Sequence, residues 1–214
     1  ARLNMLSWLT CAPPTCRSLE LYIQDVLNKF ASHIDGLTRT FDTPLAEGLD
    51  LDPSLSPQVG STEHAELVDM RTTYMSIVGA LLWIANMCAP ELAYPTSQLA
   101  RVLSNPSPSH FKAALRILCY LRTHGSKGLH YAPRIEMGFE AYTDASWLAR
   151  YSCSGALFYF YGCLFAWYSK MQRSVSLSSA EAEYFGAMMC ARDVIFYRAV
   201  SSSNSHAYST LHSH

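Results

Sequence analysis

The hydrophobic pattern of this 214-residue chain changes its period once, near residue 138. Before that point, apolar residues recur at steps of three and four, as in residues 19–30. From residue 139 the odd and even positions alternate in character, and two aromatic runs follow at residues 156–161 and 164–168. A helix repeats its buried face about every 3.6 residues and a strand every two. The sequence therefore predicts an α+β protein in which helices precede a sheet.

The helical part contains several segments of different clarity. We expect helices at residues 19–30, 73–87, about 93–103 and 110–123, with Ser109 as the N-cap of the last. Three prolines and two glycines fall within residues 42–62, which we interpret as a linker. A final helix opens at Ser178, where Ser178 and Glu181 match the S-x-x-E capping box, and continues to about residue 200.

The sheet part is predicted from its aromatic runs. Gly162 separates two of them and favours a tight hairpin, and residues 175–177 form a candidate third run. A first strand is expected to end at Asp144. The aromatic strands at residues 156–161 and 164–168 have few neighbouring strands, which leaves an edge of the sheet exposed. We therefore expect the chain to self-associate.

Composition limits the class of function. The net charge of −1 gives no global positive field, so any binding of nucleic acid must be local. Seven scattered cysteines without a C-x-x-C pair indicate a reducing compartment, and we expect an intracellular protein, cytoplasmic or nuclear. The most apolar run, residues 74–88, is shorter than the roughly 20 residues of a membrane span, so no membrane anchor is expected.

Two acidic residues are candidates for chemistry. Asp144 follows a strand, where it is either a turn-forming residue or a metal ligand. Glu181 is explained by helix capping, whereas Glu183 is expected to point toward the sheet and to require a partner such as a cation. This orientation follows from small and apolar positions in line with Glu183, namely Ala187, Cys190 and Val194.

Four basic residues are candidates for contacts to phosphate groups. Lys112 and Arg116 form an i,i+4 pair on one helix, and Lys170 and Arg173 follow an aromatic run. Ordinary surface charge explains all four equally well.

Several motifs together resemble a known family. Residues 142–147 (YTDASW), Ser154-Gly155, residues 167–172 (WYSKMQ) and residues 177–184 (LSSAEAEY) resemble the ribonuclease H region of copia-type retrotransposon Pol polyproteins. Upstream, residues 74–83, 90–94 and 104–121 resemble the segment that joins reverse transcriptase to that nuclease, and residues 21–45 resemble its start. The resemblance covers roughly residues 19–200.

The resemblance implies a function and a site. Asp144 and Glu183 match the first two catalytic acids of the family, which cleaves RNA in RNA–DNA hybrids with Mg²⁺. The expected partners are an RNA–DNA hybrid and the remainder of the Pol polyprotein. The expected fold is an incomplete ribonuclease H-like mixed sheet with one packed helix. The alternatives are a non-catalytic remnant that binds nucleic acid or a partner, and a structural remnant without function.

The sequence also departs from the family. It contains no adjacent Asp-Asp pair, so polymerase activity is not expected, and no acid follows Asp193 where the third nuclease acid would lie. The loop after Trp147 looks shortened. We therefore expect the chain to be nearly inactive as a nuclease and to bind Mg²⁺ weakly.

These matches divide the chain into expected regions. Residues 1–17 are unassigned, 18–62 resemble a thumb-like remnant of reverse transcriptase with a linker, and 63–133 form a helical connection. Residues 134–200 form a partial ribonuclease H-like domain, and the Ser-rich tail 201–214 is expected to be disordered.

Overall fold

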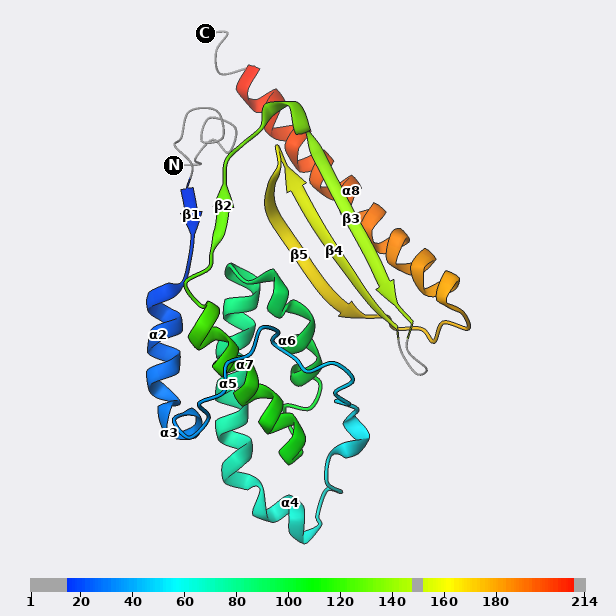
Figure 1. Ribbon diagram of the computed structural model, residues 1–214. Coiled ribbons are helices and arrows are strands. Elements are labelled where there is room, and N and C mark those ends of the chain that lie inside the picture. The colour runs from blue at the N-terminus through cyan, green and yellow to red at the C-terminus, as the bar shows by residue number, and fades with distance from the viewer. Residues whose placement is uncertain (1–14, 148–151, 210–214) are drawn as a thin grey trace. The chain divides into compact units, whose positions relative to one another are not determined.

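The computed structural model describes residues 15–147 and 152–209, and it is α+β (Figure 1). The chain divides into two compact units, unit 1 from Ala1 to Pro133 and unit 2 from Arg134 to His214. Unit 2 begins at the residue where the ribonuclease H-like segment was expected to start. The predicted loop after Trp147 and residues 1–14 and 210–214 lie outside the described residues. In the described ranges, no helix has both the length and the apolar character needed to cross a membrane.

Unit 1 is mainly helical. Its helices are α2 (Glu20–Lys29), α3 (Ala31–Ile34), α4 (Thr62–Glu66), α5 (Val68–Met87), α6 (Ala93–Ala100) and α7 (Pro108–His124), with short 3-10 turns at Pro53–Leu55 and Pro90–Leu92. Two short strands, β1 (Thr15–Arg17) and β2 (Leu129–Tyr131), pair antiparallel and join the two ends of the unit. This pairing was not predicted, because strands of three residues carry no measurable period.

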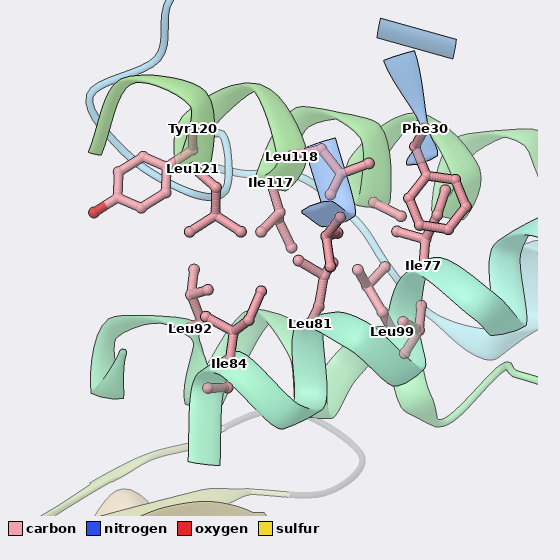
Figure 2. Packing of buried hydrophobic residues seen from close by; sticks show 14 of the residues in the cluster. Phe30, Ile77, Leu81, Ile84, Leu92, Leu99, Ile117, Leu118, Tyr120 and Leu121 are labelled. Atoms are coloured by element: carbon pink, nitrogen blue, oxygen red, sulfur yellow. The ribbon is translucent and has the colours of Figure 1, made fainter. Parts of the chain in front are cut away.

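One hydrophobic core holds unit 1 together (Figure 2). Leu81 and Ile84 of α5 face Ile117 and Leu121 of α7, and Phe30 closes the core from the end of α2. The predicted regions 18–62 and 63–133 therefore share a single core. The amphipathic face predicted for residues 19–30 is the reason, since its buried side chains pack into this core: Ile23, Val26 and Leu27.

The beginnings of two helices differ from the predictions. Helix α5 begins at Val68 rather than near residue 73. The N-cap of α7 is Ser107, not Ser109: Ser107 Oγ accepts from the His110 backbone N–H at 3.4 Å, and His110 Nδ1 accepts from the Ser107 N–H at 3.1 Å. Pro108 explains the shift, because its fixed φ suits the first helical position and places the cap one residue before it.

Unit 2 is a three-stranded sheet with one helix. The strands β3 (Phe139–Ser146), β4 (Cys153–Phe160) and β5 (Cys163–Met171) lie in the order β3-β4-β5, and both neighbouring pairs are antiparallel. A short 3-10 turn, Ile135–Met137, precedes β3. The predicted hairpin is confirmed, with Tyr161 at φ 52° and Gly162 at φ 75° in a two-residue turn. Residues 175–177 form no strand.

The expected mixed sheet is, in the described residues, purely antiparallel. A parallel neighbour needs a crossover connection, and α8 (Ser179–Ser209) is the first helix that follows the strands. This helix covers one face of the sheet, where Gly186 lies against Ala145 and Ser154, and the ring centroids of Phe158 and Tyr197 are 5.1 Å apart.

Helix α8 is longer than predicted, because it continues through residues 201–209, which were expected to be disordered. A helix that has already formed extends at little cost per residue, and no proline or glycine interrupts residues 201–209. The Ser-rich composition alone was therefore a poor guide to disorder here.

Candidate functional site

Asp144 lies within β3, opposite Gly155 of β4, and the strand continues to Ser146. It is therefore not a turn residue, and that alternative is wrong. The neighbouring Ala145 faces α8, since a Cβ at Gly186 would lie 3.3 Å from the Ala145 Cβ. Side chains alternate along a strand, so Asp144 lies on the face of the sheet that α8 does not cover. Its side chain is exposed.

Glu183 is also exposed, so its predicted inward orientation is wrong. The buried face of α8 is centred on Ala182 and Gly186, and Glu183 lies about 100° around the helix from Ala182. The prediction placed Ala187 on the buried face, but Ala187 is exposed, and Gly186 occupies that face because a glycine permits the closest approach of helix and sheet. An exposed carboxylate needs no partner to offset burial, so the inferred requirement for a partner such as a cation does not hold.

The two acids nevertheless lie at the same end of unit 2. Ala145, next to Asp144, meets Gly186, which is one helical turn after Glu183. Figure 1 shows the start of α8 beside the final residues of β3. Within the described part of the chain, neither carboxylate accepts a side-chain hydrogen bond or forms an ion pair. No group of three or more His, Cys, Asp or Glu residues suited to a metal ion occurs among the described residues.

The start of α8 is fixed by a capping interaction. Ser178 Oγ accepts from the Glu181 backbone N–H at 3.1 Å, and Glu181 Oε2 accepts from the Leu177 N–H at 2.6 Å. The capping role predicted for Glu181 is confirmed. An acidic side chain at this end also complements the helix dipole.

Gln172 is a buried residue that the sequence analysis did not single out. Its Nε2 donates to Ser154 Oγ at 2.9 Å and to the Ala182 carbonyl oxygen at 2.7 Å. Its Oε1 accepts from Ser176 Oγ at 2.9 Å. Because Ala182 precedes Glu183, Gln172 ties the backbone beside Glu183 to β4. Arg173 and Ser174, which follow it, are exposed, so no hydrophobic periodicity could have revealed this burial.

A second contact joins the end of β3 to the same loop. Trp147 Nε1 donates to the Ser176 carbonyl oxygen at 3.0 Å. Ser176 therefore connects to Gln172 through its side chain and to Trp147 through its backbone. These bonds hold together the strand that carries Asp144 and the helix that carries Glu183.

Asp193 has a different setting from the two candidate acids. It lies about 15 Å along α8 from Glu183. The Arg192 guanidinium pairs with it at 3.3 Å. Burial, assisted by the charge of Asp193, raises the pKa of Tyr168 to about 12. Asp193 thus belongs to the interface between α8 and β5.

The four basic candidates are divided between the units. Arg116 donates through Nη2 to the carbonyl oxygen and Oγ1 of Thr43, both at 3.2 Å, and its guanidinium lies 4.0 Å from the Phe41 ring centroid. Arg116 therefore binds the loop that contains Phe41 and Thr43 in unit 1. Lys112 is exposed. Lys170 and Arg173 are exposed on unit 2, and Lys170 Nζ lies 4.7 Å from the Tyr168 ring centroid. Neither unit contains all four.

The helical unit and the antiparallel sheet under one helix define a chain of the α+β class. No protein-family model matches it, and no solved structure matches it. It is 32% identical over 186 residues to the retrovirus-related Pol polyprotein from transposon TNT 1-94 of Nicotiana tabacum, covering 85% of the chain and 13% of that polyprotein. It is 35% identical over 175 residues to a putative transposon Ty5-1 protein of Saccharomyces cerevisiae, covering 79% of the chain and 54% of that protein.

A third relative has a different description. The chain is 34% identical over 127 residues to a secreted RxLR effector protein 161 of Plasmopara viticola, covering 58% of the chain and 89% of that protein. Two Pol polyproteins of Arabidopsis thaliana, from the transposons RE1 and RE2, are 32% and 31% identical to the present chain. The chain belongs to the family of copia-type retrotransposon Pol polyproteins, of which it represents a fragment.

Proposed function

We propose that unit 2 is a ribonuclease H-like segment of a Pol polyprotein, in which Asp144 and Glu183 bind Mg²⁺ for cleavage of RNA in RNA–DNA hybrids. The observation that carries this proposal is the contact of Gly186 with Ala145, which brings the strand and the helix that bear the two acids to one end of the unit. Both acids are exposed there, as a site for a large polyanionic substrate requires.

In number and kind, two carboxylates match the ligands of one hydrated magnesium ion. Mg²⁺ is commonly held by one or two carboxylates and keeps several water ligands. When bound, it would supply positive charge for the phosphodiester and lower the pKa of a bound water. Two ions about 4 Å apart need further carboxylates, and the described residues offer none in a cluster with these two. We infer that full activity needs an acid from the remainder of the Pol polyprotein.

Other residues of unit 2 support the site without binding the metal. Gln172 and the capping pair Ser178 and Glu181 hold the first turn of α8 in place. Lys170 and Arg173 are exposed and positively charged, which suits contacts to the phosphates of the hybrid. Because such contacts release counterions, the binding of a hybrid is expected to weaken steeply with salt.

Cleavage of a labelled RNA–DNA hybrid in magnesium tests the activity. The chain as it stands is expected to cleave very slowly, and a version extended by the acidic strand that follows the helix in the family should cleave at least about 100-fold faster. In the extended version, Asp144→Asn or Glu183→Gln should abolish the gain, whereas Glu136→Gln, at an exposed acid of unit 2, should not. Strong cleavage by the unextended chain would contradict the need for a further acid.

Metal binding can be measured separately from cleavage. Titration with Mn²⁺, followed by electron paramagnetic resonance, should show weak binding to the chain that Asp144→Asn and Glu183→Gln each reduce. The matched Glu136→Gln variant should bind like the original. Equal Mn²⁺ binding by all four proteins would refute the assignment of these two ligands.

A further inference from the structure

Helix α8 carries an apolar stripe on the side that faces away from the sheet. Tyr184, Met188 and Ile195 are 82%, 55% and 70% exposed, and Ala191 is exposed between them. At about 100° per residue, these four side chains fall within an arc of about 60°. The arc lies opposite Ala182 and Gly186, which define the buried face. A helix that is apolar on both sides normally has both sides covered.

The spacing within this stripe is that of a helix–helix seam. Tyr184, Met188, Ala191 and Ile195 follow one another at steps of four, three and four residues. This is the a/d spacing by which two helices pack along their length. The stripe ends in opposite charges, because Glu181 lies in line with it on one side and Arg198 on the other, and both are exposed.

We propose that α8 pairs in antiparallel orientation with α8 of a second copy of this chain. In this register Tyr184 lies opposite Ile195 of the second copy, and Met188 lies opposite its Ala191. Each large side chain then meets a smaller one, and every contact occurs twice about a two-fold axis, as an isologous dimer requires.

Charge at the ends of the stripe selects the second copy and its direction. The antiparallel register places Glu181 opposite Arg198 of the second copy at both ends. A parallel pair would instead place Glu181 beside Glu181 and Arg198 beside Arg198, which is repulsive. The stripe is therefore complementary to itself in one direction only. A single helix pair buries little surface, so we expect a dissociation constant of roughly 10–100 μM.

The oligomeric state of the full chain tests the pairing. Sedimentation over a range of concentrations should show a monomer that becomes a dimer. Ile195→Lys and Met188→Lys, each at an exposed position, should weaken the dimer at least tenfold. The matched control is Leu21→Lys, because Leu21 is 84% exposed on α2 of unit 1, and it should leave the dimer unchanged. A monomer at all concentrations, or association that the two stripe variants do not alter, would overturn the proposal.

Disulfide crosslinking tests the direction of the pair. In a background with Cys11→Ser and Cys16→Ser, Tyr184→Cys is mixed with a size-tagged Ile195→Cys protein under oxidising conditions. The antiparallel register predicts a disulfide between the two proteins and none within either kind. Like positions would be about 16 Å apart along the helix axis, beyond the roughly 7 Å reach of a disulfide. A disulfide between two Tyr184→Cys chains would show a parallel pair and overturn the proposed register.

Discussion

The two units of this protein bury their apolar residues to very different degrees. In unit 1, α5 and α7 bury many side chains completely, among them Ile77, Leu81 and Leu118. In unit 2, the described core between α8 and the sheet has three buried members, Ala156, Phe158 and Cys190, packed among partly buried apolar residues.

The difference follows from the architecture of the units. Helices can surround a core on all sides, whereas a sheet has two faces and α8 covers one of them. On the other face of the sheet, Tyr142 is 56% exposed and Leu157 is 36% exposed. Unit 1 therefore buries more of its apolar side chains. Unit 2 leaves Asp144, Glu183 and the outer apolar stripe of α8 exposed.

The largest effect is expected from a cavity in unit 1. Leu81 of α5 is completely buried in the core that α5 forms with α7. Leu81→Ala should therefore lower the free energy of unfolding of unit 1 by about 2–5 kcal/mol. Hydrogen exchange, resolved by peptide mass, should show faster exchange throughout α5 and α7. Amides of β4 should exchange at the original rate, because the chain divides into separate compact units.

The matched control for this cavity is Leu21→Ala, which removes the same atoms from an exposed position of α2. It should change the stability by less than about 0.5 kcal/mol. Faster exchange in β4 caused by Leu81→Ala would show that the two units unfold together, and the comparison between them would then fail.

A smaller effect is expected from Gln172 in unit 2. Gln172→Ala leaves the Ala182 carbonyl oxygen, Ser154 Oγ and Ser176 Oγ without their partner, which should cost about 1–3 kcal/mol. Exchange at the start of α8 should increase most. Gln24→Ala, at an exposed glutamine of α2, should be nearly neutral. If Gln172→Ala and Gln24→Ala change the free energy of unfolding by the same amount, Gln172 does not hold α8 to the sheet.

The contrast between the units also explains what the sequence could predict. Periodicity correctly located the helix that became α2, and Gly162 correctly marked the hairpin of β4 and β5. Both signals are local, because they depend on residues a few positions apart. The pairing of β1 with β2 joins the two ends of unit 1, and nothing local in either strand indicates it.

The same limit of local signals applies to the candidate site. Residue types and motif spacing pointed to Asp144 and Glu183, but the orientation of Glu183 depended on which face of α8 meets the sheet. Gly186 determines that face, because a residue without a side chain allows α8 to approach the sheet closely. Gln172 could not be found either, since its role consists of three hydrogen bonds to residues on different elements.

A smaller effect, which depends on pH, is expected in unit 1. Burial lowers the pKa of His110 below its ordinary value of 6.5, so the folded chain keeps this imidazole neutral. The unfolded chain binds a proton there as the pH falls through about 6.5, and stability is lost at up to about 1.4 kcal/mol per pH unit until the folded pKa is reached.

Urea unfolding between pH 8 and pH 5 measures this loss. His110→Asn removes the titrating group and should flatten the pH dependence on the acidic side. Parallel curves for the original chain and His110→Asn would show that His110 contributes nothing to the pH dependence.

The smallest effect is expected at the start of α8 and compares two neighbouring serines. Ser178 Oγ accepts from the Glu181 N–H at 3.1 Å, so Ser178→Ala should destabilise unit 2 by about 0.5–1 kcal/mol. Ser179 is exposed and begins the helix itself, so Ser179→Ala should have little effect or stabilise slightly. Hydrogen exchange of the first turn distinguishes them: Ser178→Ala alone should speed exchange of the Glu181 amide, with α5 unchanged. Equal exchange in the two variants would mean that the sheet contacts of Gly186 and Gln172, and not the cap, determine where α8 begins.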